Sequence, residues 1–209
     1  MKNTILSTAA VAGLLVAGPS WGVLVNEGCL GGSADDLSPS TECTYVYDNA
    51  NPTGAANDSE SALNGLNLFG YNTWEIFGKQ EESNGSFSPD GTDAYSLVAT
   101  NTSDNGSNSG LWSFDSSAWA TFSSIVLVMK DGNNAPVPPQ SAGNGFYAYL
   151  LSPTDSSGSW TTENSFGGAD LSHLSAYGVR GEAQVPAPGV LGLMGIGLLG
   201  LFFASRRRV

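Results

Sequence analysis

The feature that most restricts the fold of this 209-residue chain is the shortness of its apolar runs. Between Val23 and Gln184 these runs are separated by clusters of Gly, Ser, Thr and Asn, and no apolar pattern at i, i+3, i+4 and i+7 lasts for three turns. Short apolar segments joined by turn-forming residues are typical of many short strands. We therefore predict the all-β class, as a single antiparallel β-sandwich of jelly-roll-like form.

Nine segments carry the expected strands. They are residues 44–47, 63–69, 73–77, 94–100, 110–114, 124–130, 145–152, 159–162 and 171–179. Residues 125–129 are apolar on both faces, which predicts a central strand, whereas residues 146–151 mix aromatic and small side chains, as a half-buried strand does.

The charge of the chain is strongly one-sided. All 19 acidic residues lie between Glu27 and Glu182, where Lys79, Lys130 and Arg180 are the basic residues, so this segment has a net charge of −16. Such a field repels phosphate groups and anionic lipid headgroups. The composition argues against nucleic-acid binding and leaves cations or neutral polymers as partners.

The N-terminus has the order of a secretory signal peptide. Lys2 precedes the apolar residues 5–17, which are followed by a Gly-Pro break and by the small residues Ser20 and Gly22. We expect signal peptidase to cleave between Gly22 and Val23, so that residues 1–22 are a signal peptide and residues 23–184 are the ectodomain. The alternative interpretation is a short core helix.

The C-terminus combines a proline motif, an apolar segment and a basic tail. Residues 189–204 form the apolar segment, which we expect to be a transmembrane helix of roughly 24 Å at 1.5 Å per residue. The basic tail, residues 205–209, contains Arg206, Arg207 and Arg208, which should stay cytoplasmic and leave the ectodomain outside the inner membrane. The prolines ahead of the helix impose an extended segment that a protease can bind.

This arrangement resembles the PEP-CTERM sorting signal. The resemblance rests on the motif Val185-Pro186-Ala187-Pro188, the Gly/Leu-rich segment after it and the three terminal arginines. It implies processing by an exosortase-type membrane protease, after a transient stay in the inner membrane. The proline pair of the family usually flanks a glutamate, where this chain has Ala187. The alternative is a plain C-terminal anchor that is never cut.

Part of the ectodomain is also similar to a pattern seen in ectodomains of PEP-CTERM proteins. The similarity covers residues 144–151, 157–160 and 171–178. Those ectodomains have no general assigned chemistry, so the similarity implies a β-rich surface domain and no particular reaction.

Cys29 and Cys43 are the two cysteines of the chain, and we expect them to form a disulfide that staples a loose N-terminal loop. An even pair in an exported protein is most simply explained in this way, and a loop of this length stabilises by about 3 kcal/mol in the chain-entropy view.

We expect no enzyme activity. The single histidine, His173, lies in an alternating segment with Leu171, Ser175 and Tyr177 on the same face, which is typical of a structural strand residue. No nucleophile-elbow, zinc-protease or phosphate-loop motif is present in the sequence. An acid pair for sugar hydrolysis cannot be selected from 19 acidic residues.

Two kinds of binding site are also considered. Asp90, Asp93 and Asp104 are calcium candidates on polar loops, although such loops more often form side-chain-stabilised turns and we expect no cofactor. Four tryptophans could form a glycan platform if exposed, or pack in the core if buried. They are Trp74, Trp112, Trp119 and Trp160.

The function expected from the sequence is that of a noncatalytic bacterial protein of the cell surface or the extracellular matrix, sorted through its tail. Exopolysaccharide of a biofilm matrix is a possible partner. The alternatives are an extracellular carbohydrate-binding module and a surface protein that stays anchored in the membrane.

Overall fold

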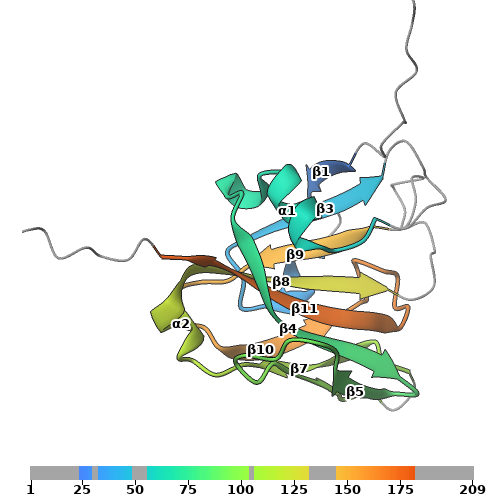
Figure 1. The fold of residues 1–209 in the computed structure, drawn as a ribbon. Coiled ribbons are helices and arrows are strands. Elements are labelled where there is room, and N and C mark those ends of the chain that lie inside the picture. Colours follow the sequence, from blue (N-terminus) through green and yellow to red (C-terminus); the bar gives the residue numbers. More distant parts are fainter. Residues whose placement is uncertain (1–23, 30–32, 49–55, 104–105, 132–144, 182–209) are drawn as a thin grey trace, which may run out of the picture.

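The structure, a computed structural model, describes residues 24–29, 33–48, 56–103, 106–131 and 145–181 (Figure 1). The predicted signal peptide and the whole segment 185–209 lie outside these residues, and so does Asp104. Within the described ranges, no helix has the length and apolar character needed to cross a membrane.

Two antiparallel sheets form the fold, as predicted for the all-β class (Figure 1). The seven strands of the larger sheet are, in spatial order, β1 (Leu24–Gly28), β3 (Glu42–Asp48), β9 (Phe146–Leu150), β8 (Phe122–Asp131), β11 (Leu171–Arg180), β4 (Trp74–Ser83) and β5 (Ser86–Pro89). The four strands of the smaller sheet are β2 (Leu37–Ser38), β10 (Ser157–Thr161), β7 (Ser109–Ser113) and β6 (Val98–Asn101). Four short helical segments connect them: η1 (Ser33–Asp35), α1 (Glu60–Gly65), η2 (Leu68–Gly70) and α2 (Ala118–Thr121).

The two sheets share one hydrophobic core. Trp112 and Trp160 of the smaller sheet are buried in the same cluster as Phe77, Leu127 and Leu174 of the larger sheet. This shared core is the arrangement of a β-sandwich, in which the inner faces of two sheets interdigitate. The jelly-roll form of the connections stays a prediction.

A second core covers the outer face of the larger sheet. Leu63 of α1 and Leu68 of η2 pack with Trp74, Val126 and Tyr177. The expected strand over residues 63–69 is therefore wrong: this segment is helical and lies on the sheet. Ser59 begins α1 by accepting a hydrogen bond from the Ala62 amide at 3.2 Å, which is a standard helix N-cap.

The second core also explains why β9 is buried on both of its faces. Phe146, Tyr147, Ala148 and Tyr149 of β9 are all buried, so the expectation of a half-buried strand is wrong. A strand is buried on both faces when helices cover its outer side. The central position expected for residues 125–129 is confirmed, since β8 pairs with β9 on one side and β11 on the other.

Three strands were absent from the sequence prediction, namely β1, β2 and β5. The β4–β5 hairpin turns at Asn84 and Gly85, with φ angles of 53° and 81°. Positive φ at both central residues is the type I′ geometry that Asn-Gly favours, so this dipeptide was the available signal for β5.

The predicted disulfide between Cys29 and Cys43 is present, with 5.5 Å between the two Cα atoms. The expectation that this disulfide staples a loose N-terminal loop is wrong. Cys29 directly follows β1, and Gly28 pairs with Thr44 in the ladder between β1 and β3. The bridge therefore ties an edge strand to its neighbour.

Candidate functional site

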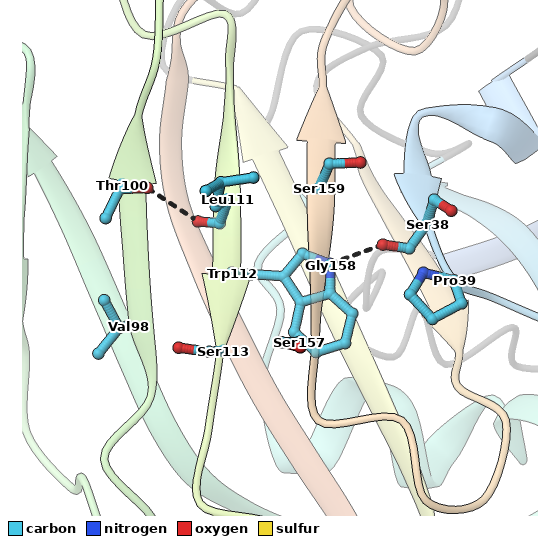
Figure 2. Close-up of a pocket in the computed structure, with 10 residues that line it drawn as sticks. All are labelled: Ser38, Pro39, Val98, Thr100, Leu111, Trp112, Ser113, Ser157, Gly158 and Ser159. Atoms are coloured by element: carbon cyan, nitrogen blue, oxygen red, sulfur yellow. Dashed lines mark hydrogen bonds between the residues drawn. The ribbon is translucent and has the colours of Figure 1, made fainter.

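A groove of about 540 Å³ runs over the outer face of the smaller sheet (Figure 2). Its lining comes from all four strands of this sheet and the residue after β2: Ser38, Pro39, Val98, Thr100, Leu111, Trp112, Ser113, Ser157, Gly158 and Ser159. The lining combines aliphatic side chains with Ser and Thr hydroxyl groups, and it contains no titratable side chain.

Strand alternation creates this surface. Val98 and Leu111 point away from the core and are 44% and 54% exposed, whereas their neighbours Ala99 and Trp112 are buried in it. Period-two alternation normally places polar side chains on the outer face of such a sheet. Two large exposed aliphatic residues at this place therefore make the groove the candidate binding surface of the domain.

The floor of the groove is held by Trp112. Its indole Nε1 donates to the carbonyl oxygen of Ser38 at 3.2 Å, which fixes the short strand β2 beside the groove (Figure 2). Gly158 lies opposite Trp112 in the β7–β10 ladder, and a Cβ atom on it would lie 1.8 Å from the same carbonyl oxygen. Only glycine at position 158 allows this close approach.

The exposed tryptophan platform considered from the sequence is wrong. Trp74, Trp112 and Trp160 are only 1%, 1% and 2% exposed, because their rings fill the two cores. Trp119 is half-buried, and its Nε1 donates to the carbonyl oxygen of Asp155 at 2.8 Å. A sugar ring cannot stack on a buried indole, so Trp74, Trp112 and Trp160 do not form a stacking platform.

A polar cluster lies between α1 and the larger sheet. His173 Nε2 lies 2.7 Å from Oδ1 of Asp58, and Nδ1 lies 3.7 Å from Oε1 of Glu81. The hydroxyl of Tyr177 donates to the carbonyl oxygen of Asp58 at 3.0 Å and to its Oδ2 at 3.3 Å. Asp58 and its neighbours thus dock the segment before α1 onto β11.

The alternation of the sequence predicts that Leu171 and His173 lie on the same face of their strand, and this prediction is wrong. Leu171 packs in the core between the sheets, with Leu174 and Ala176. A register shift between Leu171 and His173 in the pairing with β8 breaks the alternation at this point. His173, Ser175 and Tyr177 are buried, as a structural role for this face requires.

Burial and hydrogen bonding pull the pKa of Asp58 in opposite directions. Burial is the largest single cause and would raise it, but the hydrogen bond and charge of His173, together with Ser175 and Lys130, outweigh burial and lower the pKa below 3.8. Burial is also the main cause that raises the pKa of Tyr177, and the Asp58 carboxylate adds to it. At neutral pH the cluster therefore holds an ionised Asp58 and a neutral Tyr177.

The polar cluster borders a hollow of the protein surface. A hollow of about 450 Å³ beside it is lined by Asp58, Lys79 and Tyr177, among others. Both ring nitrogens of His173 face carboxylate groups, however, so neither is directed at a hydroxyl nucleophile. A general base must reach the proton that it removes, and among the described residues the polar partners of His173 are Asp58 and Glu81.

The calcium candidates make intramolecular contacts instead of a shared site. Asp90 pairs with Lys79 Nζ at 3.4 Å, and Asp93 Oδ1 accepts a hydrogen bond from the Leu97 amide at 2.7 Å. Asp104 lies outside the described residues. No cluster of three or more metal-ligating side chains occurs in the part of the chain that the structure describes.

Comparison with known proteins identifies one segment. Residues 184–208 match the family model of the PEP-CTERM protein-sorting motif, which includes the residues 185–188 and the arginines singled out in the sequence. No curated protein matches the chain, and no solved structure does so either. The match confirms the resemblance and implies export, with membrane-anchored transit toward the cell surface and processing by exosortase.

Proposed function

Starting from this sorting motif, we propose that the chain is a noncatalytic protein of the cell surface or extracellular matrix, released from a transient membrane anchor by an exosortase-type protease. The match of residues 184–208 to the motif is the observation that supports the proposal. In this scheme signal peptidase removes residues 1–22. The arginines 206–208 hold the C-terminus in the cytoplasm until the tail is cut.

Intact-mass analysis of the exported form tests the sorting step. We expect a mature chain that begins at Val23 and lacks the terminal arginines. Replacing both motif prolines, Pro186→Ala with Pro188→Ala, should leave the tail attached, whereas Pro89→Ala at the exposed edge strand β5 should not. A mature chain that keeps Arg206–Arg208 would show a plain anchor instead.

The noncatalytic part of the proposal rests on the His173 cluster. Both ring nitrogens of His173 face carboxylate groups, and the lining of the groove contains no acidic or basic side chain. We expect the exported form to turn over none of a panel of polysaccharides and peptides. Turnover that disappears in an Asp58→Asn variant would contradict this expectation.

A second candidate function, binding of a neutral polysaccharide, is favoured by the groove. Its uncharged lining of hydroxyl and aliphatic groups suits the OH and CH faces of a sugar chain, while the acidic domain repels anionic polymers. Because Trp112 lies behind the groove, binding should shift its fluorescence. Leu111→Asp should abolish the fluorescence shift, whereas the control Ser86→Asp, in β5 of the other sheet, should leave it unchanged. If no neutral polymer shifts the fluorescence of the unaltered protein, this candidate function is refuted.

A further inference from the structure

The end of β11 fixes where the sorting motif leaves the folded domain. Val179 pairs with Trp74 of β4 and Ser124 of β8, and Arg180 pairs with Phe122. The amide of Gly181 then donates to the carbonyl oxygen of Thr121 at the end of α2, at 3.2 Å. The described chain is therefore hydrogen-bonded up to Gly181, and β11 ends at the left of Figure 1, near α2.

Very little chain separates this point from the motif. The match begins at residue 184, and Pro186 is the fifth residue after Gly181. Five residues span at most about 18 Å, even when fully extended. A folded protein of only about 100 residues already has a radius of gyration of about 13 Å. A protease that holds Pro186 in its active site therefore acts within about 18 Å of Gly181, a distance comparable with the size of the domain itself.

We call the surface around this point the exit face and define it by five residues: Tyr71, Ser117, Ala120, Thr154 and Arg180. All five are exposed. Tyr71 packs edge-on against Trp74, with 5.5 Å between ring centroids, while Ser117 and Ala120 lie on the α2 side. Arg180 lies over the Phe122 ring and donates to Glu75 at 2.8 Å, so its charge is paired.

Backbone strain is also found on the exit face. Thr154 has a φ of 85°, in the turn where the Asp155 amide donates to the carbonyl oxygen of Ser152 at 3.1 Å. A β-branched residue seldom adopts positive φ and does so at a cost of about 1–3 kcal/mol. The bond from Trp119 of α2 to Asp155 holds this turn in place. Strained positions of this kind cluster at functional sites such as ligand clamps and switch regions.

We infer that the exit face is a docking surface for the membrane protease that cuts the tail, so that the folded domain itself takes part in its own sorting. The inference rests on the proposed function. The face offers an exposed aromatic ring, small polar groups, one neutralised ion pair and the exposed carboxylate of Asp115, which accepts a hydrogen bond from the Ser117 amide at 2.8 Å. Two long arginine side chains at Ser117 and Ala120 would obstruct a partner surface that fits these small groups.

Two arginines on α2 test this inference in cells that make the full chain and the protease. Ser117 makes no capping hydrogen bond through its side chain, and Ala120 is exposed, so Ser117→Arg with Ala120→Arg should leave the fold intact. We expect tail removal, followed by pulse-chase labelling and intact mass, to slow by about tenfold, as the loss of an interface contact does. The matched control is Ser83→Arg with Ser86→Arg at the β4–β5 turn, which should be processed at the rate of the unaltered chain.

A linker insertion separates docking from other effects. Ten Gly/Ser residues placed between Glu182 and Ala183 move the domain away from the motif. In that background the arginines on α2 should no longer slow tail removal. Equal rates for all variants with the native spacing, or a defect that the linker does not relieve, would overturn the inference. A tail that stays on the unaltered chain would overturn the proposed function as well.

Discussion

The buried pair of Asp58 and His173 gives the sharpest prediction for stability. The Asp58 side chain is 4% exposed and accepts hydrogen bonds from His173 and Tyr177. In Asp58→Asn an acceptor is retained but the charge is lost. A hydrogen bond to a charged group contributes about 1.5–3 kcal/mol, so we expect the free energy of unfolding of the exported form to fall by roughly 2–3 kcal/mol at pH 5.5.

The pH dependence of this loss has a defined sign. The pKa of Asp58 is lowered in the folded state, so its ionised form stabilises the fold at any pH above the unfolded value of 3.8. This contribution is lost as the pH falls through the lower, folded pKa. The difference between the unaltered chain and Asp58→Asn should thus be full at pH 5.5 and should shrink below pH 3.8.

Urea unfolding of four proteins measures both effects. They are the unaltered chain, Asp58→Asn, His173→Gln and the double variant. The sum of the two single losses should exceed the loss in the double variant by about 1–2 kcal/mol, which is the coupling energy of the pair. Additive losses, or a difference that stays constant down to pH 3, would refute the view that these two side chains form one ionic hydrogen bond.

Three further predictions concern the backbone and the disulfide. Gly110→Ala should lower the free energy of unfolding by at least about 2 kcal/mol, because the added Cβ would lie 1.7 Å from a carbonyl oxygen of the adjoining strand. The control is Gly65→Ala in α1, where the added Cβ meets nothing within 4 Å and the substitution should be neutral or slightly stabilising. Thermal melts compare the two variants. Thr154→Gly should raise the free energy of unfolding by up to about 1 kcal/mol by removing strain at positive φ, and a loss measured by urea unfolding would contradict this. Replacing Cys29 and Cys43 by serine should cost about 3 kcal/mol, and a reducing agent should change the stability of the unaltered chain but not of this variant.

Local patterns in the sequence were enough for most strands of the larger sheet. The apolar run of β8 and the alternation of β11 both identify strands that the structure contains. The α1 segment could not be recognised in the same way, because a helix of six residues is too short to show a helical period. Its capping serine, Ser59, was the available signal.

The groove and the His173 cluster depend on contacts between distant parts of the chain. Asp58 and His173 are 115 residues apart, and the groove combines β2, β6, β7 and β10, which no single-sequence pattern brings together. The sorting motif is the opposite case. Its residues are contiguous, so the order of motif, apolar segment and arginines was readable without a fold, and the family match confirms it.

The position of β11 within the larger sheet bears on how the domain is made. In the part of the chain that the structure describes, strands β4 and β5 join the other five only through β11, which is the last of these strands in the sequence. A chain that crosses a membrane from its N-terminus delivers this strand after every other. Until residue 180 has emerged, β4 and β8 each present an unpaired edge, and the ladder between the two halves cannot close. In the proposed export scheme, completion of the domain and arrival of the sorting motif outside the cell membrane are thus nearly simultaneous events.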